Sequence, residues 1–73
     1  MDHEIRSDIA GTVWQVPATV GAEVADGEVL VILESMKLEI PVSATAAGTL
    51  TELRVAPGDA VEEDQVLAVV SSA

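Results

Sequence analysis

The chain repeats one pattern twice, with an offset of 37 residues and no gap between the copies. The shared positions pair Ala10-Gly11-Thr12 with Ala47-Gly48-Thr49, Gly21 with Gly58, Val24 with Val61, and Val29-Leu30 with Val66-Leu67. Two copies are too few for a solenoid, which needs several stacked units to bury its apolar faces. The repeat therefore predicts one closed domain whose two interlocked halves, about 5–36 and 42–73, are related by a pseudo-two-fold axis.

Both copies predict β-strands. Val, Ile, Leu and Thr dominate short runs that are bounded by Gly, Pro and Asp. The continuous apolar runs at 29–33 and 66–70 are typical of strands that are buried on both faces. A helix over 29–38 is the alternative, but β-branched residues crowd this segment and Pro41 follows it closely. We therefore expect a single all-β domain over 1–73: a flattened antiparallel β-barrel or sandwich of about eight short strands, a barrel-sandwich hybrid.

One turn position is filled differently in the two copies. Gly27 precedes the apolar run of the first copy, and Asp64 stands at the equivalent place in the second. Glycine adopts a left-handed backbone freely, and Asp tolerates this conformation better than most residues do. The exchange indicates a turn residue with a left-handed backbone in both copies.

Composition excludes several functions. The chain has no cysteine, so disulfides, thiol chemistry and cysteine-based zinc sites are not available, and the single His3 makes no metal site alone. The sequence shows no nucleophile–base pair and no glycine-rich phosphate loop, so we expect no catalytic residues. The net charge of −10, with only Arg6, Lys37 and Arg54 as cations, argues against nucleic acids and anionic membranes as partners.

The sequence shows no targeting or membrane-spanning segment. No apolar run is long enough to span a bilayer. The first residues lack the charged, apolar and small-residue regions of a signal peptide. These observations favour a soluble cytoplasmic protein, which we expect to be monomeric in isolation.

Trp14 is the only aromatic residue of the chain. An aromatic side chain with a polar edge suits a surface that docks a partner, and it equally suits a cap over one open end of a barrel. Packing is the more frequent use of a lone tryptophan, so we expect the side chain of Trp14 to be packed against the barrel.

Lys37, the only lysine, lies between the two copies. The strand that ends near Glu34 and the strand that begins near Leu38 are consecutive, so about three residues join them in a tight hairpin over 34–39. Lys37 is then at an exposed apex, where an enzyme could reach its amine and acylate it. A solvated turn lysine with no such role is the alternative, and spacing alone does not decide between the two.

The residues around Lys37 carry a family resemblance. Glu34-Ser35-Met36-Lys37-Leu38 resembles the attachment motif of biotinyl domains, in which methionine precedes the modified lysine and methionine or leucine follows it. The resemblance covers almost the whole chain, since such domains have turns at the places of 20–24 and 57–61. The fragment Ile40-Pro41-Val42 after the motif resembles free-standing bacterial biotin/lipoyl attachment proteins. The chain departs from the family at Leu38, where methionine is commoner, and it has no residues for the protruding thumb of some acetyl-CoA carboxylase carriers.

The resemblance implies roles for the five residues of this motif. Lys37 would be the covalent attachment site of biotin. Met36 and Leu38 would be the neighbours that a biotin protein ligase inspects, although both side chains could also pack the hairpin onto the barrel. Glu34 and Ser35 complete the motif, and Glu34 either discourages lipoylation or is simply solvated at the end of its strand.

The resemblance also implies a function, that of a biotin carboxyl carrier protein, a subunit of a biotin-dependent carboxylase. A biotin carboxylase would load the carboxyl group and a carboxyltransferase would remove it, so the carrier is not itself an enzyme. A lipoyl carrier, with lipoate on Lys37 and acyl or aminomethyl groups as cargo, is the first alternative, although lipoyl domains usually have Asp where this chain has Met36. An unmodified structural or assembly domain is the second alternative.

Overall fold

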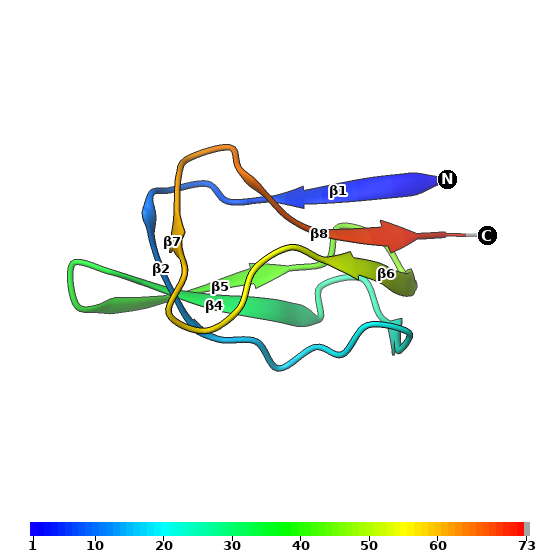
Figure 1. Cartoon of the computed structure of the whole chain (residues 1–73). Helices are drawn as coiled ribbons and strands as arrows, with labels where there is room; N and C mark the ends of the chain where they lie inside the picture. Colours follow the sequence, from blue (N-terminus) through cyan, green and yellow to red (C-terminus); the bar gives the residue numbers. More distant parts are fainter. Residues whose placement is uncertain (73) are drawn as a thin grey trace.

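Eight β-strands make up the fold in the computed structural model, which describes residues 1–72 (Figure 1). In chain order they are β1 (Asp2–Arg6), β2 (Gly11–Gln15), β3 (Glu23–Val24), β4 (Val29–Ser35), β5 (Leu38–Ser43), β6 (Gly48–Leu53), β7 (Ala60–Val61) and β8 (Val66–Ser71). They form two antiparallel sheets: the hairpin sheet, ordered β5-β4-β2-β7, and the opposite sheet, ordered β1-β8-β6-β3. The all-β prediction is confirmed, and no helix that could cross a membrane occurs in the described residues. Ala73, the last residue of the predicted domain, lies outside them.

The two sheets are copies of each other under the sequence repeat. A shift of 37 residues carries β2, β3 and β4 onto β6, β7 and β8, and β5 takes the place of β1. Under this exchange the strand order of one sheet becomes the strand order of the other. Each copy contributes to both sheets, because β3 pairs with β6 and β7 pairs with β2. The predicted pseudo-two-fold arrangement of the fold is therefore confirmed.

Equivalent turns are held by equivalent hydrogen bonds. The amide of Gly27 donates to the carbonyl oxygen of Ala44 at 2.9 Å, and the amide of Asp64 donates to the carbonyl oxygen of Ser7 at 2.7 Å. Gly27 has a φ of 87° and Asp64 a φ of 71°. These angles confirm the left-handed backbone that the sequence predicts at both places.

The core fills the space between the two sheets, and it is entirely aliphatic. Its buried hydrophobic members are Ile5, Val13, Val24, Leu30, Val31, Leu33, Ala44, Leu50, Val55, Val61, Leu67, Ala68 and Val70. Trp14 is not among them: its side chain is 45% exposed, so the expectation that it packs against the barrel is wrong. The physical reason is the alternation along β2: Val13 faces the core, so the next side chain, that of Trp14, points to the outer face of the sheet.

The chain ends and the β4–β5 hairpin lie at opposite ends of the molecule, whose longest dimension is 37 Å (Figure 1). At the far end, the amine of Met1 donates to the carbonyl oxygen of Ser72 at 2.7 Å, and the amide of Ser72 donates back to Met1 at 2.8 Å. This pairing extends the β1–β8 ladder. The hairpin is therefore clear of the rest of the described chain.

Candidate functional site

β4 and β5 form the hairpin that carries Lys37. Their last cross-strand pair is Ser35 with Leu38, so Met36 and Lys37 alone make the turn, one residue fewer than the sequence predicted. Met36 and Lys37 have φ angles of 52° and 67°. Two left-handed residues in a two-residue loop define a type I′ turn, whose twist matches that of the flanking strands.

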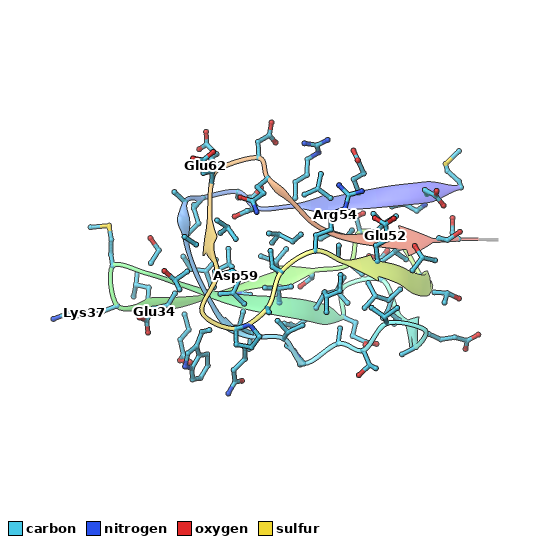
Figure 2. The ribbon with its side chains drawn as sticks, viewed as in Figure 1. Glu34, Lys37, Glu52, Arg54, Asp59 and Glu62 are labelled. Atoms are coloured by element: carbon cyan, nitrogen blue, oxygen red, sulfur yellow. The ribbon has the colours of Figure 1, made fainter. Side chains whose placement is uncertain are left out.

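The turn presents the amine of Lys37 at the tip of the molecule. Lys37 is exposed and its side chain points away from the body of the protein (Figure 2). A left-handed backbone costs a residue other than glycine roughly 1–2 kcal/mol. The β4–β5 ladder, which pairs residues from Val29 to Ser43, holds the turn in this conformation. The amine therefore sits on a rigid support rather than on a flexible loop.

The amine of Lys37 is free of salt bridges with the residues that the structure describes. The two ion pairs found there join Arg6 to Glu4 at 2.7 Å and Arg54 to Glu52 at 2.9 Å. Both pairs lie on or next to strands of the opposite sheet, away from the hairpin. The arginines are thus engaged elsewhere, and the amine is available to an incoming partner.

Two carboxylates stand directly behind the turn. Glu34 on β4 and Glu39 on β5 form the cross-strand pair next to the turn-closing pair. Side chains that are directly opposite share one face of the sheet, and like charges in that arrangement repel each other. The sequence motif pointed to Glu34 but not to Glu39, because only the register of the hairpin reveals that the two are opposite.

Gly11 allows β2 to approach the base of the hairpin. A Cβ atom built on Gly11 would lie 2.8 Å from the carbonyl oxygen of Glu34, which is too short for a contact between a carbon atom and an oxygen atom. In the second copy, a Cβ atom on Gly48 would overlap the carbonyl oxygen of Ser71. The repeat marks both glycines in the sequence, but the backbone that each one approaches is visible only in the folded chain.

The five motif residues singled out from the sequence occupy this one hairpin. Ser35 is half-buried, whereas Glu34 and Lys37 are exposed. Met36 is 92% exposed and Leu38 is 65% exposed, so neither side chain packs the hairpin onto the barrel and both are free to contact a partner. No group of His, Cys, Asp or Glu within residues 1–72 is arranged to hold a metal ion.

Comparisons with known proteins agree with this geometry. The family profile described as "Biotin-requiring enzyme" matches residues 3–70. The chain is 39% identical over 71 residues to a "Biotinylated protein TB7.3 homolog" of Mycobacterium leprae, covering 97% of this chain and 100% of that protein. It is 38% identical over 68 residues to a "Biotin/lipoyl attachment protein" of Bacillus subtilis, covering 93% of each. Among solved structures, the urea carboxylase of Kluyveromyces lactis matches with a TM-score of 0.93 and 32% identity over 97% of this chain, which corresponds to 6% of that chain.

These matches are not confined to the short motif around Lys37. They span the repeat, both sheets and the hairpin, because the family profile begins in β1 and ends in β8. The relatives from Mycobacterium and Bacillus are matched over nearly their whole length. This chain therefore belongs to the family of biotin/lipoyl attachment domains, whose profile carries the description "Biotin-requiring enzyme".

Proposed function

We propose that this protein is a biotin carboxyl carrier and that Lys37 is the residue to which biotin is attached. The position of Lys37 carries the proposal: it is the only lysine of the chain, and it lies exposed at the apex of the type I′ turn. Membership of the biotin/lipoyl attachment family supports biotin as the group attached. The likeness to a stretch of a urea carboxylase supports a role in a biotin-dependent carboxylase.

Attachment requires a biotin protein ligase that uses ATP. A carboxylate oxygen of biotin attacks the α-phosphorus of ATP; the O–P bond forms, the bond to the β-phosphate breaks, and pyrophosphate leaves, which gives a mixed anhydride of biotin and AMP. The Nζ atom of Lys37, after releasing one proton, attacks the carbonyl carbon; the amide N–C bond forms, the C–O bond to AMP breaks, and AMP leaves with the electron pair. A second proton leaves Nζ as the amide forms. The chain itself contributes position, because the turn holds the amine where the ligase active site can enclose it.

The carrier role follows from the same geometry. Biotin, once attached, supplies a ring nitrogen that accepts and releases a carboxyl group. The β4–β5 ladder supports the arm stiffly, and the turn keeps the point of attachment clear of the rest of residues 1–72. A biotin carboxylase and a carboxyltransferase that dock this protein would then each meet the arm at a high local concentration.

We also propose that the carrier is monomeric in isolation. An open sheet edge is a template for pairing with another chain, and β5 and β1 are edge strands of the two sheets. Pro41 is exposed on β5 and has no N–H to donate to a neighbouring strand. β1 exposes Asp2, Glu4 and Arg6, and charged side chains on an edge oppose pairing.

A lipoyl carrier is the second candidate function. The name of the Bacillus relative includes both cargoes, and the turn would present a lipoyl group as readily as a biotinyl group. Met36 favours biotin, since lipoyl domains usually have Asp at this position.

Measurement of the intact mass distinguishes the candidates. The purified protein is incubated with a bacterial biotin protein ligase, biotin and ATP, and separately with a lipoate ligase, lipoate and ATP. We expect the mass to increase by one biotinyl group, that is biotin less water, in the first reaction. A mass increase in the second reaction alone would show that the protein is a lipoyl carrier and not a biotin carrier. No mass increase in either reaction would support an unmodified structural domain.

Gly11→Ala is expected to slow biotinylation and to destabilise the fold. The added Cβ atom would press on the carbonyl oxygen of Glu34 and displace the base of the hairpin, at a cost of about 1–3 kcal/mol. Gly48→Ala is the matched control, because its Cβ atom would press on Ser71, at the other end of the molecule. Urea unfolding should show both variants to be destabilised, whereas the initial rate of biotinylation of folded protein should fall only for Gly11→Ala. Equal rates for the two variants would show that the ligase does not sense the position of the hairpin.

A further inference from the structure

The outer face of the hairpin sheet carries three apolar side chains, Trp14, Ile32 and Pro41, which we call the apolar row. Ile32 pairs with Pro41 on one side and lies beside the bulge that contains Trp14 on the other. Ile32 points outward because its neighbours Val31 and Leu33 are fully buried. Ile32 is half-buried, whereas Trp14 and Pro41 are exposed. The row therefore crosses the sheet from β2 to β5 and faces solvent.

The second copy of the repeat builds the same face without apolar side chains at its two ends. The shift of 37 residues places Thr51, Val69 and Glu4 at the three equivalent positions. The pairing is also equivalent: Val69 pairs with Glu4, and the β6–β8 register has its own bulge at Thr51. A fold that forms with Thr and Glu at these places does not require Trp and Pro there. The apolar row is therefore a property of the half that carries Lys37 and not of the fold.

An acidic pair separates the apolar row from the turn. Glu34 and Glu39 are the next outward-facing residues toward Lys37, and neither has a salt bridge with a described residue. The ion pairs formed by Arg6 and Arg54 belong to the opposite sheet. A partner that covers this face must therefore offer an apolar patch next to positively charged side chains.

We propose that the apolar row is a docking surface for the biotin protein ligase, which would contact it with an apolar patch flanked by Lys or Arg side chains. The inference rests on the proposed function. The ligase acts on the amine of Lys37 itself, so the ligase surface must approach the turn to within the length of one lysine side chain. An enzyme that acts on the far end of the attached biotin can stay farther from the turn.

The distances fit a ligase that covers the hairpin. The apolar row lies four strand positions behind the turn, or about 13 Å. A protein–protein interface of ordinary size buries about 800 Å² on each partner, and therefore extends well beyond the turn onto the face of the sheet. The apolar row is the part of this face where burial would release the most apolar surface from water.

Trp14→Thr tests the proposal and is expected to fold, because Thr51 already occupies the equivalent bulge. With purified biotin protein ligase, biotin and ATP, we expect the KM for the carrier to rise at least about tenfold through loss of an aromatic anchor. The kcat should stay within about twofold, because Lys37 and its turn are unchanged. Trp14→Phe keeps an aromatic ring and should keep most of the affinity. An unchanged KM for Trp14→Thr would overturn the proposal.

Val20→Thr is the matched control. Val20 is also exposed, at 53%, but it lies in the β2–β3 connection, where the amide of the following Gly21 donates to Leu50 of the opposite sheet. The KM of the ligase for Val20→Thr should equal its KM for the parent protein. An equal rise in KM for Val20→Thr and Trp14→Thr would refute a specific docking surface. Failure of the proposed function has a different signature, because the parent protein itself would then take up no biotin.

Trp14 also provides a direct probe of docking, since it is the only tryptophan of the chain. Carrier protein that is produced with fluorotryptophan gives a single signal in its fluorine NMR spectrum, and addition of unlabelled ligase should shift or broaden this signal. The Lys37→Arg carrier should respond in the same way, because docking on the sheet face does not require the amine. A resonance that stays unchanged at ligase concentrations well above the KM would contradict the proposal.

Discussion

A Lys37→Arg variant is expected to incorporate no biotin at all while it folds as the parent protein does. Arginine keeps the positive charge and the long side chain, and Lys37 is exposed, so the exchange does not alter the buried core. The guanidinium group stays protonated and delocalised at any pH that a protein tolerates, so it offers no nucleophile to the activated carboxyl group. Intact mass after reaction with biotin protein ligase checks the modification, and circular dichroism on heating checks the fold. Any biotinyl group on this variant would refute Lys37 as the attachment site, because the chain has no other lysine.

A swap of the two turn residues is the sharper control, since it keeps the composition. The variant Met36→Lys/Lys37→Met retains one lysine in the same type I′ turn, but the amine leaves the backbone one position earlier and in another direction. Displacing a reacting group by about 1 Å can cost on the order of 100-fold in rate. We therefore expect kcat/KM for biotinylation to fall by at least about 100-fold. A rate close to that of the parent protein would show that the ligase needs an exposed lysine but not this geometry.

The repeat made much of the fold predictable, because it constrains which strands are equivalent. It required the connection between the copies to be a hairpin, and it thereby placed Lys37 at an apex before any motif was considered. It also predicted the left-handed backbone of Asp64 from the glycine at the equivalent position, which the φ of 71° confirms. Both inferences depend on local chain geometry, which sequence patterns report well.

The features that the sequence did not reveal depend on cross-strand register. The bulge at Trp14 is one of them: β2 and β4 slip by one residue between Val13 and Gln15, which places Trp14 beside Ile32 as an extra residue on the same face. The pairing of Glu34 with Glu39 and the close approach of Gly11 to Glu34 likewise join residues through strand pairing. A change of register by one residue reverses which face each side chain occupies, and the apolar pattern alone does not fix it at a bulge.

Leu30→Ala and Leu67→Ala are each expected to destabilise the fold by about 3 kcal/mol. Leu30 on β4 and Leu67 on β8 occupy equivalent positions of the repeat, and both are 0% exposed. Truncation removes apolar contacts and leaves a cavity that the surrounding core fills only in part. For a domain of this size the loss corresponds to a fall of about 15 °C in the midpoint of thermal unfolding. Urea and thermal unfolding followed by circular dichroism measure both quantities.

Leu38→Ala is the control for this pair, because it removes the same atoms from a leucine that is 65% exposed and should change stability by less than about 0.5 kcal/mol. The comparison of Leu30→Ala with Leu67→Ala then tests the symmetry itself. Equal losses in the free energy of unfolding would show that both copies contribute equally to one core. The features special to the half with Lys37 would then be confined to its surface: the turn, the acidic pair and the apolar row. A difference of more than about 1.5 kcal/mol, beyond the usual scatter for one kind of truncation, would show instead that the core beneath the hairpin differs in strength from its counterpart.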